Sequence, residues 1–454
     1  MFRQKDHSVI KENIYEIEEK AYDLFIRNHN QPSIKEYQDV IKLIKDYIKK
    51  KNLIVYGGYA QNELILDKNK DDGFYREVDM PDFEIYSPDP IKHSVEIADL
   101  LYEKGYYNPK VDSAVHDGTY KIFCNLVNYS DISYMPLNIY NNCPTIKLKG
   151  IRYTHPHFMM TDAYRVYSDL LASNYRLVKT FNRMSKLFDY YPIDEKLQYN
   201  QIKYKLKNKD DVKEFIRKKI IHNSKLIVIG HYAFNYYVKK TQLNNYVIEK
   251  YPYYEIISTD YENDVKKIYK ILKDKYKKNI EINGYYPFFT FFDNRAEFIL
   301  NGEIVLKLYG NNSRCVPYRI SEKKLTNFGT TQTVILYLFM DYNYAIINKN
   351  KEESTNYLSM IIKLFKARDA YLDDNMLSVL DDSPFKEFTY ECLGVPVDGM
   401  RQSMLEGIKR VQSGKSFKKF SYYPKGKKIN IPNVNFNNTS GNMIKNELHK
   451  PKLK

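Results

Sequence analysis

The sequence contains no tryptophan, only four cysteines and no apolar run of 18 residues or more. The missing apolar run excludes a membrane-spanning helix, and the first twenty residues lack the charged-then-apolar order of a secretory signal. We therefore expect a soluble protein that stays inside a cell and has no membrane partner. The four cysteines (Cys124, Cys143, Cys315 and Cys392) are scattered, without a CxxC pair or a nearby histidine. This spacing argues against a disulfide framework and a zinc knuckle, so any metal must be held by oxygen.

Acidic residues are also in the minority. The chain has 71 Lys and Arg against 56 Asp and Glu, a formal charge of +15 and a pI near 9.1. This balance suits a polyanionic partner, because each phosphate that a cation neutralises releases counterions. A chain with 45 tyrosines and many Lys, Asn and Ile residues is also what an A/T-rich genome encodes whatever the function. The charge therefore favours nucleic acid without establishing it.

The length of the chain predicts more than one domain. A single core rarely grows beyond about 250 residues, and this chain has 454 residues with 43% hydrophobic content. Its pattern divides into N-terminal helices over 1–50, an α/β domain over 51–190, a similar domain over 191–320, a helical part over 321–414 and a tail over 415–454. The tail carries ten lysines and one acid, Glu447, which is typical of a basic, flexible terminus.

Periodicity places strands between helices in the first α/β domain. Ser33 and Glu36 form a capping-box pair at the start of a helix over 33–50. The further elements are a strand over 53–56, a glycine turn, a strand over 82–86, a helix over 91–104 and strands across 121–134. Later helical stretches cover 157–190, 328–347 and 353–373. The alternation predicts an α/β or α+β fold around a mixed sheet.

The first unit recurs later in the chain. LIVYGGYAQNELI at 53–65 matches LIVIGHYAFNYYV at 226–238, and PDFEIYSPDP at 81–90 matches PYYEIISTDY at 252–261. The first pair of segments is 173 residues apart and the second pair is 171 residues apart. The two copies therefore stay in register over a whole unit except for a shift of two residues. We interpret this as an internal duplication.

Three carboxylates are candidates for metal chemistry. Side chains alternate faces along a strand, so Asp82 and Glu84 project from the same side. Two adjacent carboxylates repel unless a cation lies between them, and a pair of Mg²⁺ ions held this way can grip a triphosphate and an attacking hydroxyl. Asp131, an acid within an apolar run, is the candidate third ligand from a neighbouring strand. Alone, an Asp-x-Glu pair on a strand is more often a solvated edge.

Gly57 and Gly58 add a possible phosphate cradle. A tight glycine turn that opens a helix presents backbone N–H groups and the positive end of the helix dipole, with no Cβ in the way. Most glycine pairs after a strand are only turns, so the pair gains weight from its order with the carboxylate strands.

That order resembles the nucleotidyltransferase superfamily of DNA polymerase β type. Five stretches carry a closer resemblance to the poly(A) polymerase catalytic subunits of poxviruses, asfarviruses and mimivirus-like giant viruses: VYGGYA, PDFEIYSPDP, VEIADLLYEKGY, DISYMPLNIYNNCPTI and THPHF. The resemblance is closest to the giant-virus members, dense over 53–190 and continuous to about residue 410. It implies a duplicated nucleotidyltransferase fold, with 51–190 catalytic and 191–320 a degenerate copy.

The resemblance implies template-independent addition of adenylates from ATP to mRNA 3′ ends. Asp82, Glu84 and Asp131 would be the catalytic and metal-binding residues for two Mg²⁺ or Mn²⁺ ions, where family members often have Asp in place of Glu84. Gly57, Gly58 and Tyr59 would bind ATP, although Tyr59 stands where the family has Ser or Gly, which puts a hydroxyl contact in doubt. Arg176 and Lys179 match the family's Tyr-Arg-x-x-Lys block and are expected at the triphosphate or primer, with a solvated helix face as the alternative.

Several alternatives stay open. The chain could be an RNA-binding or scaffold subunit that is catalytically weak, or a nucleotidyltransferase for a tRNA end, a protein or a small molecule. Asp79 competes for a metal role, and His155 and His157 are either proton carriers or structural. We expect a homodimer, with a separate processivity subunit as the alternative. The resemblance implies a host cytoplasmic location in a viral factory, with packaging in the virion as an alternative.

The second copy is expected to lack chemistry. Its alignment sets Tyr253 opposite Asp82, Glu255 opposite Glu84 and His231 opposite Gly58, and its strand at 304–309 has no acid. One carboxylate cannot hold two ions, so this copy would only shape the RNA groove.

Overall fold

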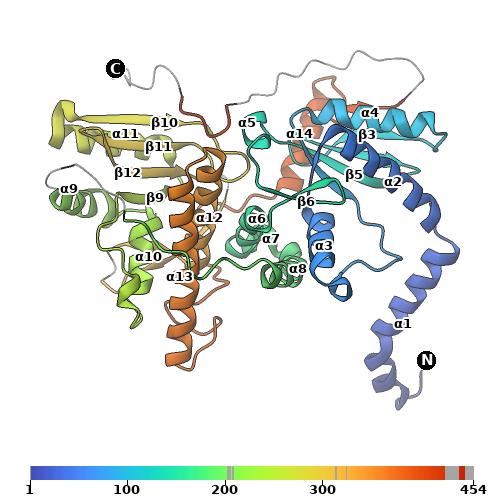
Figure 1. Cartoon of the computed structure of the whole chain (residues 1–454), viewed down its shortest axis with the longest axis horizontal. Helices are drawn as coiled ribbons and strands as arrows, with labels where there is room; N and C mark the ends of the chain where they lie inside the picture. The colour runs from blue at the N-terminus through green and yellow to red at the C-terminus, as the bar shows by residue number, and fades with distance from the viewer. Residues whose placement is uncertain are drawn as a thin grey trace. The chain divides into compact units, whose positions relative to one another are not determined.

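The computed structural model describes residues 2–201, 206, 209–311, 314–323, 325–424 and 439–444. The chain forms two compact units, each with its own sheet (Figure 1). The first unit comprises Met1–Tyr134, Thr145–Thr154 and Ser403–Asn435, and the second comprises Met135–Pro144, His155–Gln402 and Phe436–Lys454. Within the described ranges, no helix is both long and apolar enough to cross a lipid bilayer.

The first unit is built on a mixed sheet, as the alternation of elements predicted. Only the β1–β7 and β2–β5 pairs are parallel, and the other neighbours run antiparallel. In spatial order the strands are β16 (Ser421–Tyr422), β3 (Lys110–Ser113), β4 (Thr119–Cys124), β5 (Val127–Tyr134), β2 (Phe83–Ser87), β1 (Ile54–Tyr56), β7 (Ile151–Thr154) and β6 (Thr145–Leu148).

Helices pack against this sheet, and one of them begins where the sequence predicted. The Ser33 hydroxyl accepts a hydrogen bond from the Glu36 backbone N–H at 3.2 Å, which confirms the predicted cap of α2. The apolar stripe of α2, including Val40, Ile44 and Ile48, is fully buried. The helices are α1 (Asp6–Asn28), α2 (Ile34–Lys51), α3 (Gly57–Lys68), α4 (Pro90–Glu103) and α14 (Gly399–Gln412), which begins at the boundary of the unit.

The second unit repeats the sheet of the first. Seven strands follow the same order with the same directions, so the predicted duplication is confirmed at the level of topology. In spatial order they are β10 (Ile280–Tyr285), β11 (Arg295–Leu300), β12 (Glu303–Gly310), β9 (Tyr254–Ser258), β8 (Ile227–Ile229), β14 (Asn327–Gly329) and β13 (Val316–Ile320), with β15 (Cys392–Leu393) added beside β13.

An almost wholly buried helix forms the core of the second unit. Helix α12 is apolar on nearly all sides, which suits a helix that is covered on every face. It packs against α6 and α13, and Figure 1 shows α12 and α13 side by side. The helices of this unit are α5 (Leu137–Tyr140), α6 (Pro156–Ser168), α7 (Leu170–Ser173), α8 (Leu177–Tyr190), α9 (Lys209–Ile216), α10 (Gly230–Val238), α11 (Tyr261–Tyr276), α12 (Thr331–Ile347) and α13 (Lys351–Asp374).

One expectation about the cysteines is corrected. Cys315 and Cys392 form a disulfide, with their Cα atoms 5.3 Å apart, where β13 and β15 pair. The two residues are 77 positions apart in sequence, so spacing alone gave no sign of the link, which depends on the distance between Cα atoms in the fold. Cys124 and Cys143 are buried free thiols.

The tail expected to be flexible from residue 415 is folded over its described parts. Strand β16 pairs with β3, and the Tyr422 hydroxyl donates to Asp99 at 2.5 Å. In the second unit, the Ile444 backbone N–H donates to the Gly284 carbonyl at 2.9 Å. Exposed strand edges accept additional strands because their N–H and C=O groups are unpaired. Residues 425–438 and 445–454 of the predicted tail lie outside the described residues.

Candidate active site

The three predicted carboxylates lie on neighbouring strands of the first unit. Asp82 directly precedes β2, and Glu84 of β2 stands beside Asp131 of β5 in the parallel register. Phe83 and Ile85, which alternate with the acids, are fully buried. The alternation therefore directs Asp82 and Glu84 to the face opposite the core.

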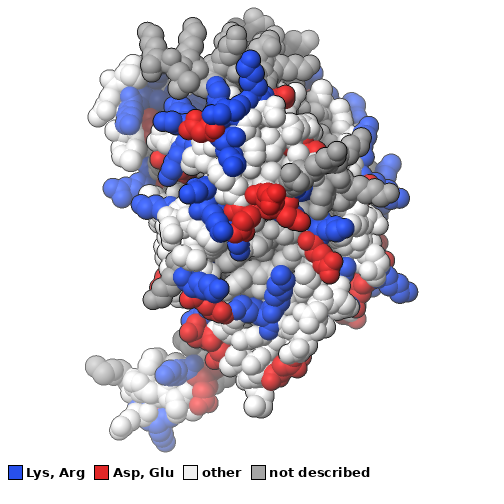
Figure 2. Space-filling view, turned by 90° about the vertical axis from the view of Figure 1, so that its left-hand side faces the viewer, with Lys and Arg blue, Asp and Glu red and all other residues white. Residues whose placement is uncertain are grey.

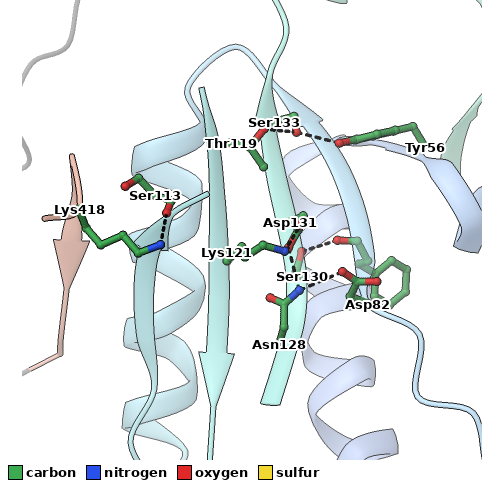
Figure 3. A network of polar contacts seen from close by, with 11 residues as sticks. Tyr56, Asp82, Ser113, Thr119, Lys121, Asn128, Ser130, Asp131, Ser133 and Lys418 are labelled. Carbon is green, nitrogen blue, oxygen red and sulfur yellow. Dashed lines mark hydrogen bonds and ion pairs between the residues drawn. The ribbon is translucent and has the colours of Figure 1, made fainter. Parts of the chain in front are cut away.

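A β-bulge brings a further residue to these acids. The register between β4 and β5 shifts between Ile122 and Phe123. Residues three apart on a regular strand point to opposite faces, and the bulge places Asn128 on the same side as Asp131. The Asn128 amide nitrogen donates to Asp82 at 2.9 Å and to Asp131 at 2.8 Å (Figure 3). The sequence analysis missed Asn128, because nothing in the sequence marks the bulge.

A lysine lies next to the same acid. Lys121 of β4 stands opposite Asp131 in the antiparallel register, and its ammonium donates to the two carboxylate oxygens at 3.0 and 2.7 Å (Figure 3). The sequence analysis did not single out Lys121 either. Its signal was a cation within the strand TYKIFC, the only charged residue in that run.

Glu84 is directed to the glycine turn. The Gly58 backbone N–H donates to the Glu84 carboxylate at 2.6 Å, at the start of α3. Gly57 has a φ of +68°, and a Cβ added to it would lie 1.7 Å from a Glu84 oxygen. Glu84 thus occupies a helix N-terminus that was predicted to receive phosphate. Across the described part of the chain, no group of three or more His, Cys, Asp or Glu side chains is gathered closely enough to hold an ion.

The remaining predicted residues lie outside this cluster. The Tyr59 side chain is buried against Phe83, with ring centroids 4.0 Å apart, and burial raises its pKa above the ordinary value. Only the backbone of Tyr59 lies at the helix start. Arg176 and Lys179 are exposed residues of the second unit, and their contact with a substrate stays a prediction.

The three alternative candidates each have a local role, and that of His157 is a bond between its ring and the Tyr191 carbonyl at 3.0 Å. Asp79 accepts hydrogen bonds from the backbone and side chain of Arg76. The His155 ring accepts from the backbone N–H of His157 at 3.2 Å and caps α6, and burial lowers the pKa of His155 to about 4. A neutral capping imidazole fits the structural interpretation of His155.

The second unit keeps the frame of this site and changes its chemistry. Gly230 has a φ of +59°, and the His231 backbone N–H donates to Glu255 at 2.8 Å, as Gly58 does to Glu84. The bulge also recurs, between Phe298 and Ile299. Lys307, however, stands beside Glu255 at the register position that Asp131 has beside Glu84.

The acids of the first unit are therefore replaced around a single remaining one. Tyr253 stands in place of Asp82, and the Lys307 ammonium donates to its hydroxyl at 2.7 Å. Glu255 is fully buried and also contacts the His231 ring at 2.7 Å. A buried acid already paired with an imidazole, beside a lysine, lacks the set of oxygen ligands that divalent ions require.

Comparison with known proteins identifies relatives over the whole chain. The family model "Poly(A) polymerase catalytic subunit" matches residues 42–173, and a model of the C-terminal part of the mimivirus poly(A) polymerase catalytic subunit matches residues 185–450. A poly(A) polymerase catalytic subunit of Acanthamoeba polyphaga mimivirus is 30% identical, covering 98% of this chain and 83% of the relative. One from African swine fever virus is 30% identical over 35% of this chain and 34% of its own length.

A solved structure is similar along almost the full length. The crystal structure of the Megavirus polyadenylate synthase aligns with a TM-score of 0.88 and 31% identity, covering 98% of this chain and 93% of that protein. This match and the mixed sheets described above support a nucleotidyltransferase fold for this chain.

Replacing Gly57 by Ala tests the contact between the glycine turn and Glu84. Gly105 is the matched control, because its φ is +82° and nothing lies within 4 Å of an added Cβ. Both substitutions should cost about 1–2 kcal/mol for the left-handed backbone. Gly57→Ala should cost about 1.5–3 kcal/mol more, since it also displaces a carboxylate from a backbone N–H. Urea unfolding measures both, and equal costs would show that the contact does not stabilise the unit.

Proposed function

Because the chain belongs to the viral poly(A) polymerase catalytic subunit family and is a polynucleotide adenylyltransferase, we propose that Asp82, Glu84 and Asp131 carry its reaction. The observation that supports this most directly is the Asn128 amide, which bonds to Asp82 and Asp131 at once. Two acids that share one amide nitrogen are close enough to act on the same substrate atoms. The substrates are ATP and the 3′ end of an RNA.

The side chains of this cluster fit a divalent cation in their chemistry. Carboxylate oxygens are the ligands that Mg²⁺ and Mn²⁺ prefer, and the Asn128 Oδ1 atom is buried without a hydrogen-bond partner among the described residues. Asp82, Glu84 and Asp131 would hold the two ions. When bound, such ions stabilise charge on the triphosphate and lower the pKa of the attacking hydroxyl.

The glycine turn and Glu84 have linked roles in substrate binding. The first backbone N–H groups of α3 suit a phosphate, but the Gly58 N–H is engaged by Glu84 at 2.6 Å. A phosphate can accept from this N–H only after Glu84 leaves it. Triphosphate binding at the turn and recruitment of Glu84 to the carboxylate cluster would then occur together.

Removing one charge from either aspartate should abolish the reaction. Asp82→Asn and Asp131→Asn each change little volume, so we expect the fold to persist while adenylate addition to an oligo(A) primer falls by about 10³-fold or more, equivalent to about 4 kcal/mol. Asp117→Asn is the control, because it removes the same charge from an exposed side chain of the same unit. Near wild-type extension by either active-site variant would refute the assignment. Catalysis by the second unit would be detected in the same assay, as primer extension that persists in these variants.

We infer an RNA-binding surface on the second unit. A pocket of about 470 Å³ lies between α9, the following π-helix Arg217–Ile221 and the end of α11. Phe215 and Tyr276 form its aromatic wall, with ring centroids 5.7 Å apart. Three lysines and two acids also line it: Lys218, Lys219, Lys275, Asp211 and Glu214. Figure 2 shows this side of the molecule, with Lys and Arg gathered in its upper part and a patch of Asp and Glu near the centre. Aromatic walls edged with lysines suit single-stranded RNA, whose bases stack while its phosphates pair.

Neutralising two pocket lysines tests this surface. Lys218 already pairs with Glu214 at 2.9 Å, so Lys219→Gln with Lys275→Gln is the informative pair. We expect oligo(A) affinity to fall about 3- to 10-fold, and the slope of log affinity against log salt to decrease by about 1.4, or 0.7 per lost phosphate contact. Lys266→Gln with Lys267→Gln, on the same helix α11 but not lining the pocket, should change neither quantity. Equal effects of the two pairs would refute the site.

We also infer a homodimer formed through α1. Ile10, Ile14, Ile17, Ala21 and Leu24 recur at alternating spacings of four and three, the pattern of a coiled-coil seam. Ile14, Ile17 and Leu24 are 43%, 54% and 53% exposed, and Ile26 is the buried residue of this 23-residue helix. A second copy of α1 would cover the stripe.

Sedimentation of the full chain tests the dimer. The wild type should sediment as a particle of twice the 54.1 kDa mass of one chain. The double variant Ile14→Glu with Ile17→Glu should sediment as a monomer, because charged side chains oppose burial of the seam. Glu12→Ala with Glu16→Ala, off the stripe, should leave the dimer intact. A monomeric wild type would contradict the proposal.

A further inference from the structure

The Lys121–Asp131 pair lies within the proposed catalytic cluster, but the proposed reaction assigns no role to the lysine. Its ammonium contacts both oxygens of Asp131, and the two side chains are 33% and 17% exposed. The Asp131 oxygen that accepts the longer of these bonds also accepts from Asn128 at 2.8 Å. Donors of the protein therefore engage the oxygens that a divalent cation would use.

The second unit also carries opposite charges at this pair of positions. Glu297 of β11 stands opposite Lys307 of β12, as Lys121 stands opposite Asp131. The charges are exchanged between the two units: Lys307 stands at the position of Asp131, and Glu297 stands at the position of Lys121. Burial alone would lower the pKa of Lys307, yet its neighbours Tyr253 and Glu297 hold it above the ordinary value.

The exchange distinguishes a counter-ion from a solvated surface lysine. A charge in a poorly solvated position is costly unless an opposite charge accompanies it. The unit that has Lys307 in place of Asp131 has an acid at the Lys121 position, so the two positions carry opposite charges in both units. Lys121 compensates Asp131 by direct contact, whereas Glu297 stands opposite Lys307 in the same register and itself pairs with Arg295 at 3.3 Å.

We propose that Lys121 is a positioning residue that acts as the internal counter-ion of Asp131 and competes with divalent cations for its carboxylate. The proposal rests on the proposed role of Asp131 as a metal ligand. A free cation that approaches Asp131 meets the like charge of the ammonium and must displace it. A cation that arrives bound to a triphosphate is accompanied by the negative charge of the phosphates. The displaced ammonium can then pair with a phosphate. Lys121 therefore disfavours metal binding without nucleotide and permits it with nucleotide.

Mn²⁺ binding to the full-length, nucleotide-free protein, followed by electron paramagnetic resonance, tests the proposal. Lys121→Met should tighten Mn²⁺ binding about 2- to 5-fold, the scale of a partly exposed ion pair, and ATP should reduce the difference between this variant and the wild type. Lys110→Met is the matched control, because Lys110 pairs with Asp112 at 2.9 Å in the same sheet, and it should leave Mn²⁺ affinity unchanged.

Two further variants separate the possible failures. Lys121→Arg keeps the charge and should bind Mn²⁺ no more tightly than the wild type, so it gives a result even if Lys121→Met does not fold. Tighter binding by Lys121→Arg, or unchanged or weaker binding by a folded Lys121→Met, would overturn the counter-ion role. Asp131→Asn should weaken Mn²⁺ binding and remove the effect of Lys121→Met in the double variant. Wild-type Mn²⁺ affinity in Asp131→Asn would instead overturn the proposed metal role of Asp131.

Discussion

In both units, a glutamate on a central strand (β2 or β9) contacts a left-handed glycine at the start of a helix (α3 or α10). This contact fixes the geometry of both units. Gly57 with Glu84 and Gly230 with Glu255 show the same close approach, with an added Cβ 1.7 or 1.8 Å from the carboxylate. In each case a backbone N–H one residue later donates to that carboxylate. Because the second unit has kept this contact without the aspartates, the glycine is required by the fold as well as suited to phosphate.

Chemistry is placed on this frame by a few side chains. The bulge, the strand order and the registers are common to both units, so they cannot explain activity. What differs is the charge on three neighbouring strands: Asp82 is replaced by Tyr253, Asp131 by Lys307 and Lys121 by Glu297. The same backbone therefore supports either a cluster of acids that can receive a cation or a cluster that contains its own cation.

Much of this was predictable from local patterns. The Ser33 cap, the two central strands, the shared side of Asp82 and Glu84, and the duplication all follow from spacing between residues close in sequence, or from repetition. The features that were missed depend on contacts across strands. The bulge that redirects Asn128, the position of Lys121 opposite Asp131 and the Cys315–Cys392 disulfide are set by register and tertiary proximity. The prediction of a flexible tail rests on its charge, whereas β16 pairs with the edge strand β3 and Tyr422 is buried.

The second unit explains why a copy without the catalytic acids remains charged inside. Glu255, Glu297 and Asp341 are buried there together with Lys307 and Arg295. Burial alone would raise the pKa of Glu255, but His231 and Lys307 hold it below its ordinary value, so the glutamate that maintains the glycine contact stays ionised. An ionised, buried acid in this position needs a nearby cation. Removing one partner of a buried ion pair is destabilising, because the other charge is then left without compensation. Lys307 supplies that cation from the chain, so the second unit retains the frame through side chains alone.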